Sequence, residues 1–115
     1  MKVKILGSVW TIEERAEKED ALLVGCDGYT DWTRRLIVIE KQMQGTLGDI
    51  GKYTRKVLRH EIIHAFLFEC GLAECSGHAD SWAENETMVD WYARMAPKIW
   101  KVWTEAKALD QKDFV

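Results

Sequence analysis

One short stretch of the chain, RHEIIHAFLFECGL at residues 59–72, carries two histidines and a glutamate in the order H-E-x-x-H. On a helix, residues four apart share a face and lie about 6 Å apart along the axis. The imidazoles of His60 and His64 can therefore converge on one zinc ion, whose bonds to nitrogen measure about 2.0–2.1 Å. Glu61 would project beside the metal, where a carboxylate can take a proton from a metal-activated water. The stretch predicts a hydrolytic zinc site.

A catalytic zinc site needs at least one more protein ligand and an open position for water. Glu86 and Asp90 are four residues apart on a predicted downstream helix, so both face the same way. Glu86 is a candidate ligand, and Asp90 is a candidate acceptor for the second ring N–H of a zinc-bound histidine. His78 is the rival third ligand, and the sequence leaves this choice open.

The HExxH motif at 60–64, followed by ExxxD at 86–90, resembles the gluzincin metallopeptidases. The short chain is similar to the minimal members of that group, the minigluzincins. The segments HEIIHAFLFECGL and ENETMVDWYA are also similar to those of small phage and prophage proteins of Gram-positive bacteria. The resemblance covers roughly residues 25–96 and extends more distantly to ImmA/IrrE-type and SprT-like proteins.

This resemblance implies a zinc-dependent peptidase with a zincin-like fold. Zinc would be bound by His60, His64 and Glu86, with Glu61 as general base and acid. Asp90 would hold a zinc-bound histidine in place. The expected substrate is a peptide or a protein.

The resemblance also implies an edge strand that aligns an extended substrate by strand addition. This role falls on the segment LIVIE, and the expected substrate-binding residues are Leu36, Ile37, Val38 and Ile39. Gluzincins further use a Tyr or His donor to stabilise the oxyanion. No position here matches that role by motif, and the candidates are His78 and Tyr92.

Other interpretations are weighed against the peptidase. The chain could be a zinc-containing regulatory or binding protein of phage or prophage origin with little or latent activity. The two histidines could be incidental on a helix that runs into the core, in a protein without a metal. Cys70, Cys75 and His78 could belong to a structural zinc site, although a matching second pair of ligands is missing.

The first half of the chain reads mainly as strands. Residues 3–12 are apolar and extended with a break at Gly7, residues 21–26 (ALLVGC) read as a buried strand, and residues 36–40 (LIVIE) as another. Residues 27–32 (DGYTDW) are rich in turn formers.

The second half reads as helices. One helix runs from Thr46 or Asp49, either of which can cap it, to Cys70, with Gly71 as the stop residue. The motif SWAE at 81–84 predicts a capping box for a second helix, which Pro97 ends or kinks before a third.

The surface and core of these helices follow from the same patterns. The basic residues of the first helix are expected to be solvated, and the tail DQKDFV is expected to be mobile. An apolar stripe on the third helix is expected to pack on the domain. The stripe comprises Ile99, Val102, Trp103, Ala106 and Leu109. Strands followed by helices predict a single α+β domain, 1–115, with a small, mostly antiparallel sheet followed by the HExxH helix and one or two C-terminal helices.

The composition limits the possible functions. With 115 residues, 47% of them hydrophobic, the chain can bury one core, and a net charge of −3 argues against binding nucleic acid. No apolar run reaches the length of a membrane span, and the N-terminus does not read as a signal peptide. We therefore expect a cytoplasmic protein, whose three cysteines are free, buried thiols.

Overall fold

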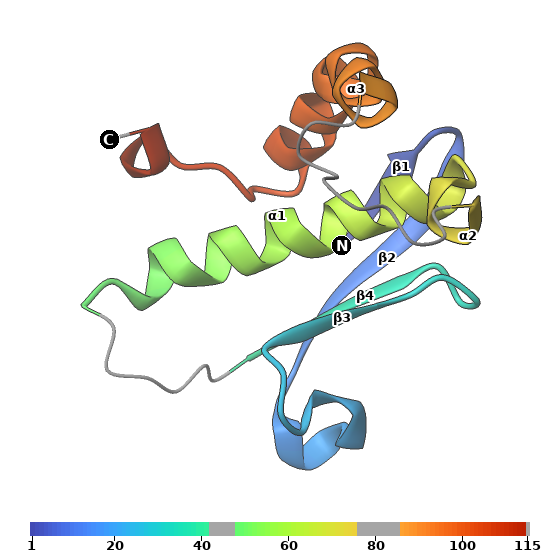
Figure 1. Ribbon diagram of the computed structural model, residues 1–115. Coiled ribbons are helices and arrows are strands. Elements are labelled where there is room, and N and C mark those ends of the chain that lie inside the picture. The colour runs from blue at the N-terminus through green and yellow to red at the C-terminus, as the bar shows by residue number, and fades with distance from the viewer. Residues whose placement is uncertain (42–47, 76–85, 115) are drawn as a thin grey trace.

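A computed structural model describes residues 1–41, 48–75 and 86–114 of the chain, and Figure 1 shows how the elements are arranged. The strands are β1 (Lys2–Ile5), β2 (Ser8–Arg15), β3 (Gly28–Asp31) and β4 (Leu36–Glu40). The α-helices are α1 (Ile50–Glu69), α2 (Leu72–Cys75) and α3 (Glu86–Glu105). Short 3-10 helices span Glu17–Glu19, Ala21–Leu23 and Gln111–Phe114.

The four strands form one mixed sheet in the order β1-β2-β4-β3. The pairs β1/β2 and β3/β4 are antiparallel, and β2 and β4 are parallel. The expected α+β class and the mostly antiparallel sheet are therefore confirmed. The position of LIVIE at an edge was predicted wrongly: β4 is an interior strand, and the described edges of the sheet are β1 and β3.

Local backbone chemistry explains the N-terminal half. Leu6 and Gly7 both have positive φ, at 50° and 87°, which gives the two-residue hairpin turn between β1 and β2 and confirms the break at Gly7. The predicted strand at 21–26 is wrong, because the side chain of Asp20 accepts a hydrogen bond from the Leu22 amide and starts a 3-10 turn instead. The segment expected to be turn-rich contains β3, which pairs with β4.

Helix α1 crosses the middle of the molecule, with the sheet on one side and α3 on the other (Figure 1). The side chain of Asp49 caps it by accepting from the Lys52 amide, and Gly71, at φ +84°, follows its end. Both the cap and the stop residue are as predicted. The core-facing residues of α1 are Val57, Ile62, Ala65 and Phe66.

Helix α3 is one continuous helix that contains Pro97. Of the one or two C-terminal helices predicted, the described chain therefore has a single long one, and a helix end before Pro97 was predicted wrongly. Proline removes the bond to the carbonyl four residues earlier, here Ala93, which is exposed and can be hydrated. The predicted apolar stripe is confirmed, since Ile99, Val102 and Trp103 are buried in the main core. In the described part of the chain, no helix combines the length and apolarity needed to cross a bilayer.

The C-terminal end of α1 is fixed to the sheet by one carboxylate. Glu69 accepts hydrogen bonds from Trp10 Nε1 at 2.7 Å, from Arg35 Nε at 2.6 Å and from Ser8 Oγ at 3.3 Å. Burial opposes ionisation of Glu69, but the hydrogen bonds from Arg35 and Trp10 outweigh it and lower the pKa. One helix end is thereby tied to β2 and to the residue that precedes β4.

The tail is ordered through a second carboxylate, contrary to the mobile tail that was expected. Asp113 accepts from Arg55 Nε at 2.8 Å and from Arg59 Nη1 at 3.3 Å, and only 3% of its side chain is exposed. These two arginines of α1 are therefore paired rather than freely solvated. Hydrogen bonding from Arg55 lowers the pKa of Asp113 to about 2.

We predict that Asp113→Asn lowers the melting temperature at neutral pH by roughly 5 °C, since it removes a charge-assisted contact between the tail and α1. The folded pKa is depressed, so the stabilisation is present above the unfolded value near 3.8 and is lost as pH falls toward about 2. Thermal melts by circular dichroism at neutral pH and near pH 3 should show the difference shrinking.

The matched control is Asp90→Asn, because Asp90 pairs with Arg94 on an exposed face and such pairs contribute little. An equal loss in both variants, or a loss that does not change with pH, would contradict the assigned role of Asp113.

Candidate functional site

The two histidines of the HExxH motif lie on the exposed side of α1 with their rings directed toward each other. Their Nε2 atoms are 3.1 Å apart, and the ring centroids are 4.7 Å apart in an edge-to-face arrangement. Two zinc–nitrogen bonds of 2.0–2.1 Å at a tetrahedral angle would place the nitrogens about 3.3–3.4 Å apart. The observed spacing fits two ligands of one zinc ion, and it also allows one ring to donate a hydrogen bond to the other.

Glu61 lies between α1 and the sheet and is only 7% exposed. The hydroxyl of Thr30 on β3 is 2.9 Å from its Oε1 and 3.0 Å from its backbone carbonyl oxygen. A carboxylate at this depth needs such a partner, because an unpaired buried charge is costly. Strand β3 therefore positions the candidate general base.

The approach of α1 to β3 depends on Gly28. A Cβ at this position would come within 3.0 Å of Ile39 Cδ1 and of the Val38 carbonyl, and within 3.2 Å of Val57 Cγ1 on α1. Without a side chain at this position, the helix can lie close enough to the strand for Glu61 to reach Thr30. The sequence analysis did not single out Gly28 or Thr30, because it assigned residues 27–32 to a turn-rich segment.

The candidates for a third metal ligand are Glu86 and His78. Glu86 is the first residue of α3, but its side chain lies outside what the structure describes, as does the whole of His78. The predicted capping box at 81–84 is also outside the described residues. Within residues 1–41, 48–75 and 86–114, no group of three metal-ligating side chains is found.

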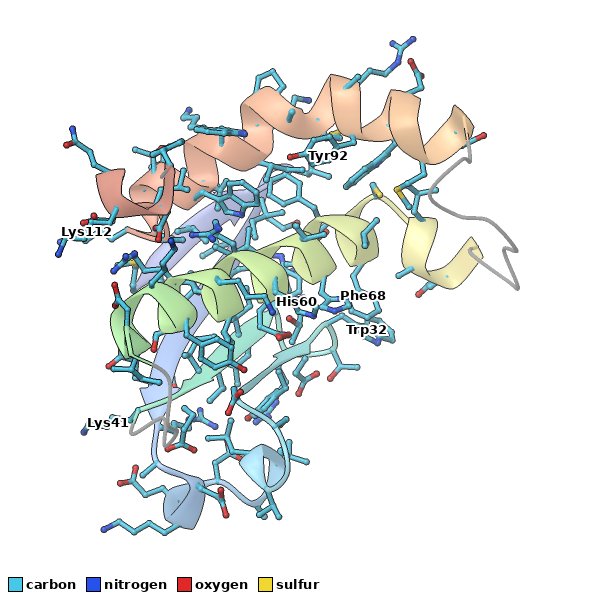
Figure 2. The ribbon with its side chains drawn as sticks, turned by 60° about the vertical axis from the view of Figure 1, so that its left-hand side comes forward. Trp32, Lys41, His60, Phe68, Tyr92 and Lys112 are labelled. Carbon is cyan, nitrogen blue, oxygen red and sulfur yellow. The ribbon has the colours of Figure 1, made fainter. Side chains whose placement is uncertain are left out.

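Two other predicted site residues are on α3. Asp90 forms an exposed ion pair with Arg94 at 2.8 Å, and its role in orienting a ligand histidine stays a prediction. Tyr92 is 44% exposed on α3 (Figure 2), and no described contact brings it to the histidines. The structure assigns no oxyanion donor among the described residues.

The predicted substrate-binding residues are buried in the sheet, which corrects the sequence-based expectation. Leu36, Ile37, Val38 and Ile39 are each at most 6% exposed, and both sides of β4 are paired with other strands. A peptide cannot add to an interior strand, since its backbone groups are already used. The error arose because the strand order depends on a parallel crossover that the sequence pattern does not specify.

The edge strand next to the histidine helix is β3. The Glu40 amide donates to the Asp27 carbonyl, and hydrogen-bonded pairs alternate along an antiparallel ladder. The backbone groups of Tyr29 and Asp31 therefore face β4, and those of Gly28 and Thr30 face outward. In the described chain, β3 has no strand on that side.

An aromatic pair marks the far end of the same edge. Trp32, which follows β3, stacks on Phe68 of α1 with ring centroids 6.1 Å apart, and Trp32 is 51% exposed. Phe68 follows His60 and His64 at successive steps of four residues, so the three share a face of the helix. Figure 2 shows His60, Phe68 and Trp32 near one another on the side of α1 that faces the β3–β4 hairpin.

The cysteines do not form a described site. Cys26 and Cys70 are free, as predicted, but both are exposed rather than buried. The side chain of Cys75 lies outside the described part. The alternative structural site of Cys70, Cys75 and His78 therefore stays untested.

Comparisons with known proteins identified no relative of this chain. No protein-family model matches the chain, and no significant match was found among curated proteins or solved structures.

We predict that Thr30→Val lowers the free energy of unfolding by about 1–2 kcal/mol, because the Glu61 carboxylate loses a buried hydrogen-bond donor. Urea denaturation measures the loss. The matched control is Thr11→Val on β2, whose hydroxyl has no described partner and which should cost less than about 0.5 kcal/mol.

Part of this effect should disappear when Glu61 is replaced, while the bond from the Thr30 hydroxyl to the backbone carbonyl of residue 61 remains. In a double-mutant cycle with Glu61→Met, the loss from Thr30→Val should shrink by about 1 kcal/mol. Strictly additive losses would show that the two side chains do not interact.

Proposed function

We propose that the protein is a zinc-dependent peptidase of the gluzincin type, with His60, His64 and Glu86 as the zinc ligands. The observation that carries this proposal is the pair of histidine Nε2 atoms 3.1 Å apart, on the helix turn beside a buried carboxylate. An incidental pair of surface histidines would not need a neighbouring glutamate held by a strand. The position of Glu86 at the start of α3, the next long helix, is compatible with the third ligand role.

When bound, zinc lowers the pKa of a ligated water and polarises a carbonyl group. Glu61 is the group of this chain that can accept a proton beside the histidines and return it to the leaving amine. The Thr30 hydroxyl donates to one oxygen of Glu61 and so fixes the carboxylate in one orientation. A fixed orientation reduces the entropy lost when the reacting groups meet.

The outward-facing backbone groups of Gly28 and Thr30 are the proposed alignment site for an extended peptide. Strand addition would place the peptide along β3, antiparallel or parallel, next to the turn of α1 that carries His60 and His64. The Trp32–Phe68 pair at the end of this edge, in which Trp32 is exposed, offers an aromatic surface for one apolar side chain of the substrate. This assignment replaces the one to β4.

The alternative is a regulatory or binding function, which is favoured by the lack of an assigned oxyanion donor among the described residues. A zinc-containing regulatory or binding protein with little or latent peptidase activity would use the same metal ligands but would not need such a donor. The two functions differ in turnover and not in zinc content.

We predict about one zinc per chain in protein purified without chelator, measured by elemental analysis. His60→Ala and Glu86→Ala should each lose most of it, because each removes one of three protein ligands. Cys70→Ser is the control and should keep the metal. Zinc retained in His60→Ala, or lost in Cys70→Ser, would contradict the proposed ligand set.

We further predict that Glu61→Gln keeps the zinc and loses at least about 100-fold of the hydrolysis rate on a mixture of quenched fluorescent peptides, since an amide cannot act as the base. Glu74→Gln, at an exposed position of α2, is the control. A zinc-loaded wild type without any turnover would favour the regulatory protein, and an active Glu61→Gln would contradict the role of Glu61.

A further inference from the structure

A hollow lies between β1 and α3, at the edge of the sheet opposite β3. Its volume is about 850 Å³, and it shares no lining residue with the histidine site. Figure 1 shows β1 beside α3, with β3 at the far edge of the sheet. The hollow is therefore separate from the proposed peptidase site.

The lining of this hollow is strongly basic for a protein of net charge −3. Lys2 and Lys4 come from β1, Lys98 and Lys101 from α3, and the one acidic lining residue is Glu105. All four lysines are exposed, and none is ion-paired with a residue of the described chain. Four lysines among the lining residues make this region positively charged, which favours a ligand of negative charge.

The backbone of β1 supplies directional binding groups at the same place. The amino group of Met1 donates to the Ile12 carbonyl, and the Ile12 amide donates to the Met1 carbonyl. Hydrogen-bonded pairs alternate along the hairpin, so Val3 and Ile5 also face β2. The N–H and C=O groups of Lys2 and Lys4 then point away from the sheet, along an edge with no described partner strand.

The chemistry of the hollow favours a peptide over other anions. Its apolar lining includes Leu6, Phe66 and Val102, which suit alternate side chains of a strand and not a phosphate backbone. Pairing with a second copy of β1 is disfavoured, because it would place Lys2 and Lys4 of both chains close together.

We propose that this groove binds an extended, acidic segment of a partner protein, which adds to β1 as a fifth strand. Acidic side chains of the segment would contact the lysines, and its apolar side chains would face the hydrophobic lining. Lysines at a sheet edge commonly protect it from self-pairing. Here α3 adds two further lysines from outside the sheet, which self-protection of the edge does not require.

Fluorescence anisotropy with a labelled peptide of alternating Glu and Val, about eight residues long, tests the proposal on the full chain. We expect saturable binding that weakens as salt is raised. Lys98→Glu with Lys101→Glu should weaken peptide binding at least about tenfold, since the charges of both α3 lysines are reversed. The matched control is Lys18→Glu with Lys112→Glu, which changes the net charge equally outside the groove and should stay within about twofold.

Comparing Lys4→Pro with Lys4→Ala separates strand addition from simple charge attraction, because both variants remove the same lysine charge. Only proline also removes the outward N–H, at an edge position where it is otherwise tolerated, so Lys4→Pro should bind at least about fivefold more weakly than Lys4→Ala while the circular dichroism spectrum is kept. A matched Lys–Val peptide should not bind.

Four results would overturn the proposal. The first is that the Glu–Val peptide does not bind, and the second is that the groove and control variants lose the same peptide affinity. The third is that an oligothymidine binds as tightly as the peptide and that Lys4→Pro does not weaken peptide binding more than Lys4→Ala does. The fourth is that the protein self-associates and the peptide does not displace the second copy. The third result would indicate a general polyanion surface, and the fourth a second copy as the occupant.

Discussion

The hydrogen bonds of Glu69 fix the rotation of α1 on the sheet, and the candidate site depends on that rotation. Trp10 and Arg35 hold this carboxylate at one end of the helix, and Arg55 holds the tail near the other. Between these two points the apolar residues of α1 face the core, so the neighbouring face of the helix must lie along β3. A rotation by one residue, about 100°, would move the histidines away from that edge.

Within this arrangement, the buried and exposed parts of the HExxH motif have different partners. Glu61 enters the interface with β3 and is held by Thr30, whereas His60 and His64 remain exposed and converge on each other. Gly28 permits the close approach on which this depends. Groups carried by a helix and a strand hold their positions better than groups on loops, which suits both metal binding and proton transfer. The two described sheet edges then serve separate purposes in our account: β3 for a substrate and β1 for a partner segment.

Local chemistry predicted much of α1 and little of the sheet. The Asp49 cap, the Gly71 stop and the hairpin break at Gly7 follow from residues close in sequence, and each is present. The strand order could not be predicted, because it is decided by a parallel pairing between β2 and β4. The ordered tail depends on contacts between Asp113 and arginines more than 50 positions away, for which the sequence gives no local signal. The histidine pair was predictable from its spacing, but Thr30, the hydrogen-bond partner of Glu61, was not.

The central claim is that His60 and His64 bind one zinc ion together. Anomalous diffraction from a crystal of the full chain, recorded on both sides of the zinc absorption edge, tests it most directly. Our account predicts one anomalous peak about 2.0–2.1 Å from both Nε2 atoms, with Glu86 as a further ligand. A zinc-replete crystal with no peak between these two histidines, or with its only peak at the cysteines, would contradict the account.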